Sequence, residues 1–543
     1  MIASKVSGLH GANRADFSEA QDRREAALRQ KKRELLSLYS CGLNASEMTN
    51  GVTAPRKIDS LKWIYVGSCL LIVAVAALLR ARSAMNDLWM DEIWSVELVR
   101  ELHSPLEIFT KIHHDNNHYL NSLFIYFVGQ RGNWPGYRIP AVAAGLGAIV
   151  LAWLIGRRRD RTTAFFSMFP VSFSYVMILY SSEARGYAPL IFFCFVCFLV
   201  LESLLARPRW QAAALFSISA ILGFTCHLTF LSFFVASFIW SCARMLRRKF
   251  PLPDVLGWMA ACYGAPLIYL AGLYVVDVIY LQIGGGAPMG VLRGYGTALA
   301  WTLGGPNVPS LQIITGIIAV AGLLAGLAIF FCERDDIWIF FVAAIVVMPL
   351  TVPFLEPGTL HYVRYFIIAV AFLLLLLARL LAWLYEGGAV GRIVSGVCCL
   401  SFLALNGRNV TGLIKYGRSH FSEAVQFMAD RSDDESAITF GGDQDFRVHF
   451  VLAFYWREMM AGRNMIYYDH DRWSRAGPEW VISNKESFMP PIPPRRRFTD
   501  KFGNAFELIR VFPTAPLSGL HWFIYRKTSQ VELPHAHFSG DSL

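Results

Sequence analysis

Charged residues are scarce in this sequence: Asp, Glu, Lys and Arg make up 17% of the 543 residues, whereas hydrophobic residues make up 55%. Soluble domains contain roughly 25% charged residues and about 45–50% apolar ones, so this chain has too few charges for an ordinary surface in water. The shortage excludes a soluble globular enzyme, and the apolar excess excludes a disordered or fibrous protein. Several nearly uncharged segments have about 17–20 residues, the length that crosses the hydrocarbon of a bilayer. They indicate a membrane protein.

The sequence also lacks the pattern of a disulfide framework. Its ten cysteines lie mostly inside apolar runs, where a free thiol behaves as a small hydrophobe, and none follows Cys399. Cys194 and Cys197 form a C-x-x-C pattern, but they stand in an apolar stretch, so we interpret them as helix-packing residues and not as a redox or zinc site. We therefore expect the polar C-terminal region to fold without disulfides.

Eleven apolar segments between Leu61 and Asn406 are candidate membrane spans. They cover residues 61–79, 139–156, 163–180, 187–205, 210–226, 228–243, 255–276, 310–331, 337–353, 365–384 and 393–406. A twelve-residue apolar stretch, from Tyr119 to Gln130, is too short to cross a bilayer. We expect it to form a helix at the membrane interface.

The charges in the turns predict the orientation of the spans, because Lys and Arg collect on the cytoplasmic side. If the N-terminus starts inside, the turns that carry Arg or Lys without an excess of acid are cytoplasmic: 157–161, 207–209, 244–249 and 386–392. The acidic turn at 333–336 is the exception. The net charge of +10 is then mainly an orientation signal and not a footprint for nucleic acid. The expected external loops are 80–138, 181–186, 277–309 and 354–364.

We expect three parts in the chain. Residues 1–58 form a basic cytoplasmic extension, in which Met48 is a candidate start, and residues 59–406 form the membrane domain with its first external loop at 80–138. Residues 407–543 lack long apolar runs and form an external domain. The expected fold class is mainly α: a polytopic transmembrane helix bundle of about eleven spans with a C-terminal α/β domain.

Short patterns predict the elements of that last domain. Ser422 to Ala429 has the pattern of a helix, and Ser436 to Phe440 and Trp522 to Arg526 have the pattern of strands. Pro490 to Pro494 is typical of a loop or linker. The mixture predicts an α/β domain.

Charges near a bilayer are costly and usually mark function, so the external loops hold the candidate site. Asp91 and Glu92 stand between Trp89 and Trp94, just after the first span. Partial burial among tryptophans raises the pKa of a carboxyl group and suits a general base. An N-cap for the following helix is the alternative interpretation.

A histidine-rich cluster follows in the same loop. His114 and His118 are four residues apart and can share one helix face, with Asp115 beside them. This spacing occurs among metal ligands, but the Glu of the H-E-x-x-H motif is missing and no remote third ligand is apparent. We favour polar contacts to a substrate over a metal site, with helix capping as a further alternative.

Two arginines lie on the same side of the membrane. Glu183 and Arg185 precede Tyr187 between the third and fourth spans, and Arg364 follows His361 at the start of the tenth span. A guanidinium group can hold a phosphate through two parallel hydrogen bonds. A local Glu–Arg pair and snorkelling of the arginine are the alternatives. Together the clusters supply a base, cations and hydroxyl-binding groups, as transfer from a membrane-bound phosphate donor requires.

At these residues the chain resembles the GT-C superfamily of glycosyltransferases that use polyprenyl-phosphate sugars. The similar branch contains the protein O-mannosyltransferases and the bacterial aminoarabinose transferases, and the resemblance covers roughly residues 61–385. The sequence MDEIW at 90–94 matches an early Asp-Glu pair of the family, and YRIPA at 137–141 matches its Arg-Leu-Pro-Ser segment, which includes Arg138 here. The sequence SEARGY at 182–187 matches Gln-Glu-Ala-Arg-x-Tyr without the Gln.

Two further segments complete the comparison. Arg364 and Tyr365 correspond to a late Arg-Tyr pair of the family. The interfacial helix of the family opens with His-Pro-Pro-Leu, whereas the sequence here is NHYL at 117–120, without either proline. The resemblance is therefore to the superfamily more than to one subfamily.

The resemblance implies an inverting hexosyl or pentosyl transfer from a polyprenyl-phosphate-linked sugar, with undecaprenyl phosphate as one carrier, to a hydroxyl of a protein, a lipid or an envelope glycan. It implies catalytic roles for Asp91 and Glu92, and donor-phosphate binding by Arg185 and Arg364. The expected contacts to sugar or acceptor are Glu183, Tyr187, His114, His118, His361 and Arg138. Some members of the superfamily need a divalent metal and others do not, so a possible metal stays open.

By the same resemblance we expect the bacterial inner membrane, with the N-terminus in the cytoplasm and the C-terminal domain in the periplasm. A flippase for lipid-linked sugars, or another transporter, is the alternative, and such proteins more often have internal repeats and charges near mid-membrane. A third possibility is a non-catalytic envelope protein, in which Asp91 is dispensable.

Overall fold

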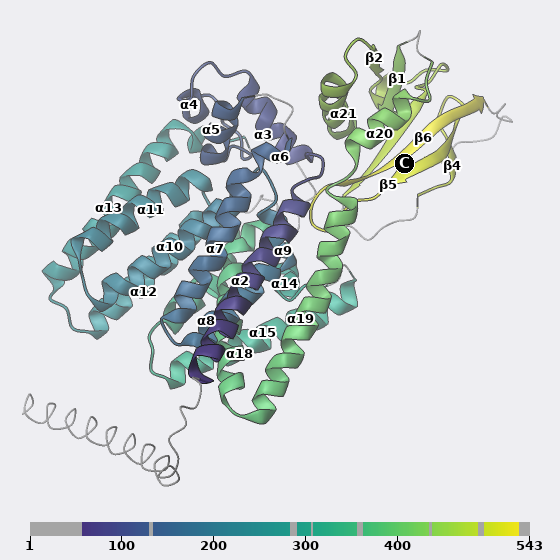
Figure 1. Ribbon diagram of the computed structural model, residues 1–543. Coiled ribbons are helices and arrows are strands. Elements are labelled where there is room, and N and C mark those ends of the chain that lie inside the picture. The colour runs from purple at the N-terminus through teal and green to yellow at the C-terminus, as the bar shows by residue number, and fades with distance from the viewer. Residues whose placement is uncertain are drawn as a thin grey trace, which may run out of the picture. The chain divides into compact units, whose positions relative to one another are not determined.

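A computed structural model describes residues 57–129, 134–282, 290–305, 308–355, 362–433, 437–486 and 494–530. The chain divides into two compact units, Met1–Gly67 and Ser68–Leu543. Most of the expected N-terminal extension lies outside the described residues. Helix α2 (Lys57–Ser83) begins in the first unit and continues into the second, and the second unit contains the other helices, the sheet and the candidate site (Figure 1).

Apolar helices make up the expected membrane domain, and eight helical stretches among the described residues are long and apolar enough to cross a membrane. The helices of this domain are α2 (Lys57–Ser83), α7 (Ile139–Arg157), α8 (Arg161–Phe173), α9 (Tyr175–Tyr180), α10 (Tyr187–Ala206), α11 (Trp210–Cys226), α12 (Phe230–Arg247), α13 (Leu252–Val276), α14 (Val291–Thr302), α15 (Pro309–Cys332), α16 (Trp338–Val342), α17 (Met348–Leu355), α18 (Ile367–Glu386) and α19 (Ala389–Tyr416). All eleven expected spans fall in helical segments, so the predicted mainly helical, polytopic fold is confirmed.

The expected span 163–180 is broken into α8 and α9. Ser174 has extended dihedral angles (φ −61°, ψ 127°), and its side chain accepts a hydrogen bond from the amide of Met177 to cap α9. Pro170 in α8 also lacks an amide hydrogen, which weakens the last turn before the break. The side chain of Asn406 in α19 accepts a hydrogen bond of 2.7 Å from the buried amide of Tyr175.

The expected span 337–353 contains a π-helical segment, Ala343–Val347, between α16 and α17. Pro349 has no amide hydrogen to donate to the carbonyl of Ile345, which would be its helical partner. The hydroxyl of Tyr295 donates to that carbonyl instead. A missing donor is a common cause of such helix irregularities.

The described part of the expected first external loop, residues 80–138, contains four short helices: α3 (Met90–Arg100), α4 (Glu107–Thr110), α5 (Tyr119–Val128) and α6 (Trp134–Tyr137). The helix α5 has ten residues, so it is too short to cross a bilayer, as its sequence indicates. Figure 1 shows these helices at the same end of the bundle as the C-terminal domain.

The C-terminal domain is α/β, as predicted, with a six-stranded sheet in the order β2-β1-β3-β6-β5-β4. Strand β1 is parallel to β2 and β3, and the remaining pairs are antiparallel. The strands are β1 (Ile438–Gly442), β2 (Met465–Tyr467), β3 (Trp480–Glu486), β4 (Arg497–Thr499), β5 (Asn504–Phe512) and β6 (Leu520–Gln530), and the helices are α20 (Phe421–Ala429) and α21 (Asp445–Met459). The expected loop at 490–494 lies almost entirely outside the described residues.

The sheet domain and the first external loop share one hydrophobic core. Ile93 and Val96 of α3 belong to the same buried cluster as Val448 and Leu452 of α21. Helix α19 also continues beyond residue 407, where the sequence suggested a domain boundary, and ends at Tyr416. The C-terminal domain therefore packs directly on the loop that carries Asp91.

Candidate functional site

A cavity of about 250 Å³ lies between the expected external loops, α14, the first turn of α15 and the C-terminal domain. Asp91, His114, Arg185 and Arg364, all predicted from the sequence, line it. The other predicted residues that the structure describes lie behind its wall. His361 lies outside the described residues.

The start of α3 gives Asp91 and Glu92 different surroundings. Trp89 is the N-cap residue, with extended dihedral angles, and its amide donates a 3.2 Å hydrogen bond back to Glu92 Oε2. Successive residues of an α-helix point about 100° apart, so the side chain of Glu92 turns into the protein while that of Asp91 faces the cavity.

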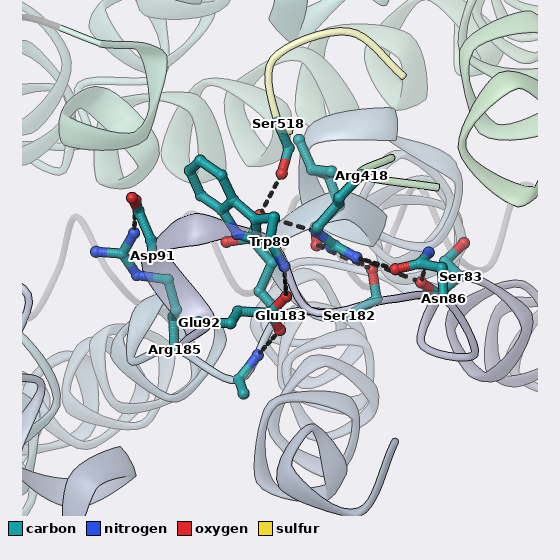
Figure 2. A network of polar contacts seen from close by, with 12 residues as sticks. Ser83, Asn86, Trp89, Asp91, Glu92, Ser182, Glu183, Arg185, Arg418 and Ser518 are labelled. Carbon is teal, nitrogen blue, oxygen red and sulfur yellow. Dashed lines mark hydrogen bonds and ion pairs between the residues drawn. The ribbon is translucent and has the colours of Figure 1, made fainter. Parts of the chain in front are cut away.

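Asp91 joins the two arginines that the sequence assigned to phosphate binding. Its Oδ2 atom accepts hydrogen bonds from Arg185 and from Nη1 of Arg364, the latter at 2.5 Å. The Arg185 side chain is only 3% exposed, and that of Asp91 is 14% exposed. Figure 2 shows Arg185 reaching Asp91 from the loop between α9 and α10. Three motifs that are far apart in the sequence thus meet at one carboxylate.

Aromatic rings surround both guanidinium groups. The guanidinium carbon of Arg185 lies 5.2 Å from the ring centre of Tyr187. That of Arg364 lies 4.9 Å from the ring centre of Tyr362 and 5.9 Å from that of Trp89. Such contacts hold a cation in place without using its hydrogen-bond donors.

Several donors at the cavity have no partner. The ring N–H groups of Trp89 and Trp301, and the Nε atoms of Arg185 and Arg364, are buried and find no hydrogen-bond partner among the described residues. All four residues line the cavity. Buried donors in native proteins are nearly always satisfied, so the cavity suits a ligand rich in acceptor oxygens.

His118 lies behind Arg185 and fixes its loop. Its Nδ1 atom accepts a 2.8 Å hydrogen bond from the amide of Gly186, and its Nε2 atom lies 3.3 Å from Arg185 Nη2. Burial, with Arg185 and His227 next to it, holds the pKa of His118 well below its usual value. His118 is therefore neutral, and it contacts the arginine loop and not the cavity.

Glu92 forms a buried pair with Arg138, and neither residue lines the cavity. The guanidinium group donates from Nε to Oε1 at 2.7 Å and from Nη2 to Oε2 at 2.6 Å. Oε1 also accepts from the amide of Ala184 at 2.7 Å. Burial raises the pKa of Glu92, but Arg138 outweighs it and lowers the pKa below its usual value. The sequence assigned a catalytic role to Glu92. Its contacts instead hold Arg138 and the amide of Ala184, the residue before Arg185.

Glu183 forms a second buried pair, with Arg418 from the segment after α19. Arg418 Nε donates to Glu183 Oε1 at 3.2 Å, and the hydroxyl of Ser518 donates to the same oxygen at 2.9 Å. Arg418 also donates to Ser182 and Asn86, as Figure 2 shows. Burial raises the pKa of Glu183 above its usual value, and Arg418 opposes that rise. Glu183 is thus connected to the C-terminal domain.

No protein-family model and no curated protein matches the chain. Among solved structures, the fold is similar to the crystal structure of ArnT from Cupriavidus metallidurans in the apo state. The identity is 14% and the TM-score 0.46, over 77% of this chain and 93% of that one. ArnT bound to undecaprenyl phosphate gives 13% identity and a TM-score of 0.46, over 84% of this chain and 98% of that one.

A third similar structure is the archaeal oligosaccharyltransferase AglB from Archaeoglobus fulgidus, in complex with an inhibitory peptide and a dolichol-phosphate. The identity is 10% and the TM-score 0.41, over 78% of this chain and 70% of that one. Because the TM-scores lie below 0.5, a function for this chain has to rest on the motifs and the geometry of the site.

The surroundings of Asp91 do not suit a metal ion. Within the described residues, no three His, Cys, Asp or Glu side chains gather in a way that could hold one. The two guanidinium groups on Asp91 also repel a cation at that carboxylate. The possible metal of the sequence-based expectation therefore finds no ligand set at this carboxylate.

The cavity contains residues that the sequence did not single out. Arg293 on α14 lies in an expected external loop, so the rule that charges near a bilayer mark function could have found it. Arg447 and Glu486 come from α21 and β3, and only the packing of the C-terminal domain brings them to the cavity. Nothing in their local sequence indicates that position.

Proposed function

We propose that the chain is a membrane glycosyltransferase of the GT-C type, which moves a sugar from a polyprenyl-phosphate donor to an acceptor hydroxyl with inversion at the anomeric carbon. The observation that carries the proposal is the contact of Asp91 with Arg185 and Arg364 at the cavity wall. Each of these residues belongs to a different motif of the superfamily that the sequence resembles. A base and two cations meet where such a transfer needs them.

In the proposed step, the acceptor oxygen attacks the anomeric carbon of the donor sugar. A new carbon–oxygen bond forms while the bond from that carbon to the phosphate oxygen breaks, and polyprenyl phosphate leaves with the electron pair. Asp91 accepts the proton of the attacking hydroxyl. Arg185 and Arg364 offset the charge that develops on the departing phosphate, and fixed cations in a site shielded from water can contribute several kcal/mol.

The arginines change partners in this account. Both guanidinium groups donate to the carboxylate of Asp91. A phosphate carries more charge and more acceptor oxygens than a carboxylate, so the donor competes with Asp91 for the same N–H groups. Donor binding then releases Asp91 to act as the base. The unused donors of Trp89 and Trp301 add to the attraction for phosphate oxygens.

Arg293 is proposed as the first contact of the donor phosphate. It lines the cavity from α14, and no ion pair is found for it among the described residues. Unlike Arg185 and Arg364, it therefore does not have to exchange a carboxylate for the phosphate. An exposed cation at the cavity also steers an anionic ligand toward the site.

The cavity extends toward a surface that suits a lipid chain. Pro309 and Gln312, in the first turn of α15, line it. The next turns of the same helix expose Ile313, Ile314 and Ile317, and α15 is one of the helices long and apolar enough to cross a membrane. A donor in the bilayer can thus present its phosphate to the cavity while its chain stays in hydrocarbon.

The location and the substrates are part of the proposal. The charges of the cytoplasmic turns support activity at the periplasmic face of the bacterial inner membrane. The lipid carrier is of the undecaprenyl class, the sugar a hexose or a pentose, and the acceptor a protein, a lipid or an envelope glycan. ArnT has been crystallised bound to undecaprenyl phosphate, and a solved structure of AglB is a complex with an inhibitory peptide and a dolichol-phosphate.

The lipid-linked sugar that accumulates when the protein is removed tests the proposal. Wild-type protein should clear this lipid and transfer its sugar, whereas Asp91→Asn should leave it in place. A flippase gives a different result, because the lipid then accumulates on the cytoplasmic face and Asp91→Asn still clears it. Unchanged transfer by Asp91→Asn would refute the catalytic assignment.

A further inference from the structure

The C-terminal domain supplies one part of the cavity wall. Phe446 and Arg447 come from the first turn of α21, and Glu486 is the last residue of β3. All three line the same cavity as Asp91 and Arg364. The proposed transfer step involves none of these three residues.

Arg447 and Glu486 form an ion pair whose side chains are 18% and 12% exposed. Taking two charges out of water costs free energy that their attraction barely repays, and apolar residues in such places often give equal or greater stability. Glu486 Oε2 is also buried without a hydrogen-bond partner among the described residues. A costly pair with an unused acceptor, placed at a cavity, is typical of a ligand-binding position.

Aromatic rings lie beside this pair. The ring of Trp94 lies 4.5 Å from that of His114 and 5.4 Å from that of Phe446, and all three residues line the cavity. Binding sites of this kind combine apolar aromatic surface with a few placed polar groups. The C–H bonds of a pyranose ring form an apolar face, and its hydroxyls form a polar edge. The aromatic rings can pack against the apolar face of the sugar, and the Arg447–Glu486 pair can form hydrogen bonds with its hydroxyls.

Tyr362 connects this wall to the reacting end of the cavity. Its ring centre lies 4.9 Å from the guanidinium carbon of Arg364, which binds Asp91. Burial raises the pKa of Tyr362 to about 12, and the charges of Glu486 and Arg447 also act on it. The pair on the C-terminal domain, Tyr362 and Arg364 all line the one cavity in which the donor phosphate is proposed to bind.

We propose that Trp94, Phe446, Arg447 and Glu486 form a subsite for a neutral sugar ring, which gives the C-terminal domain a part in substrate selection. The inference rests on the proposed glycosyl transfer and names a recognition element for it. The charges of Arg447 and Glu486 cancel, so the subsite suits a polyol and not a second phosphate. Guanidinium N–H groups donate to the sugar hydroxyls, and the carboxylate accepts from them. The ring is either the donor sugar or a sugar of the acceptor.

Binding measurements test the donor as the source of the ring. The full-length protein in lipid nanodiscs is titrated with two probes: the radiolabelled lipid-linked sugar that accumulates without the protein, and sugar-free undecaprenyl phosphate. Arg447→Met and Glu486→Gln should each weaken binding of the sugar-bearing lipid by about ten-fold or more, as loss of a hydrogen bond to a charged group does. The Kd for undecaprenyl phosphate should stay within about two-fold.

Kinetic measurements test whether the sugar ring in the subsite belongs to the acceptor. If the sugar-bearing lipid binds both variants normally, the KM for the acceptor should rise by about ten-fold or more while release of the sugar to water keeps its rate. If neither the donor Kd nor the acceptor KM changes, the subsite does not exist. Failure of the proposed function looks different, because the wild-type protein then transfers no sugar from the lipid to the acceptor.

Two sets of variants separate recognition from folding. Arg497 and Glu507 form an exposed ion pair on β4 and β5, outside the cavity, so Arg497→Met and Glu507→Gln should leave both Kd values unchanged. The double exchange Arg447→Glu with Glu486→Arg keeps an ion pair but moves the donors and acceptors. It should restore the melting temperature and leave sugar recognition impaired. Restored recognition in the exchanged protein would overturn the proposal, since the pair would then act only in folding.

Discussion

At the scale of single residues, Asp91 and Glu92 differ in what surrounds them. The sequence motif marks both as catalytic candidates, but the helix turns Glu92 into the protein, where Arg138 and the amide of Ala184 bind it. Asp91 stays at the cavity with Arg185. A motif identifies the residue type, whereas the direction of a side chain depends on what packs against the helix. We therefore propose Asp91 as the catalytic residue and Glu92 as a positioning residue.

The variant Glu92→Gln should lose stability. It leaves the charge of Arg138 buried without its partner, which typically costs about 3–5 kcal/mol. Thermal and chemical unfolding of the purified protein measure the loss. Glu97→Gln on the same helix is the control, because Glu97 pairs with the partly exposed Arg100 and Arg457, and such solvent-accessible pairs contribute only about 0–1 kcal/mol. Equal stability of the two variants would contradict the supporting role of Glu92.

The lowered pKa of the buried His227 predicts how the free energy of unfolding depends on pH. Burial lowers its pKa from 6.5 to about 3, with Arg185 and Arg364 acting in the same direction and Asp115 in the opposite one. At a pH between these two pKa values, His227 takes up a proton in the unfolded chain but not in the folded one. The contribution of the neutral, buried His227 to stability is therefore present above about pH 6.5 and is lost as the pH falls toward 3. His118 adds a loss of the same sign.

The free energy of unfolding, measured against pH, checks this prediction. His227→Gln should flatten the decline below about pH 6.5, since it removes one of the groups that must take up a proton on unfolding. An unchanged slope in the variant would show that His227 is accessible to protons in the folded protein.

At the scale of elements, the turn between α9 and α10 positions Arg185, and it requires glycine at 186. A Cβ atom there would lie 2.0 Å from the carbonyl oxygen of Cys226 and 3.2 Å from the Cβ of His118. The amide of Gly186 is also the donor to His118. The close approach of these backbones therefore sets where the guanidinium group of Arg185 lies.

Gly186→Ala should move the turn and slow the proposed transfer. Forcing a methyl group into a packed site typically costs about 1–3 kcal/mol, and the displaced arginine loses its alignment with Asp91. Rates of sugar transfer and melting temperatures measure both effects. Gly257→Ala in α13 is the matched control, because a Cβ there meets nothing within 4 Å. Normal transfer by Gly186→Ala would contradict the proposed role of the turn.

Hydropathy predicts most of the helices but not their irregularities. All eleven expected segments are helical, because apolar length alone indicates a span. The break at Ser174 and the π-helical segment before Pro349 depend on partners elsewhere in the chain, Asn406 and Tyr295. Local sequence contains no information about such partners. Strand order and the packing of α21 on α3 likewise depend on distant contacts.

At the scale of the whole molecule, the C-terminal domain is part of the site. Arg418 binds Glu183, which lies two residues from Arg185, and Ser518 binds the same carboxylate (Figure 2). The sequence brings Asp91 and the two arginines to one face through membrane topology alone. It cannot place Arg418, whose contacts exist only after the C-terminal domain has folded against the bundle.

A double-mutant cycle on Glu183 and Arg418 measures this connection. Glu183→Gln or Arg418→Met alone leaves one buried charge unpaired and should cost about 3–5 kcal/mol, while the double variant should cost less than the sum of the two. Unfolding free energies of the four proteins give the coupling. Additive losses would mean that the C-terminal domain and the arginine loop are energetically independent.

The exchange of partners at Asp91 is tested most directly by binding and transfer measured on the same protein, Asp91→Asn. Removal of the carboxylate frees Arg185 and Arg364, so undecaprenyl phosphate should bind the variant at least as tightly as it binds wild type. Transfer of the lipid-linked sugar should fall by about 100-fold or more, since a general base typically contributes 10²–10⁴-fold. Weaker phosphate binding together with undiminished transfer would contradict both the base and the competition for the arginines.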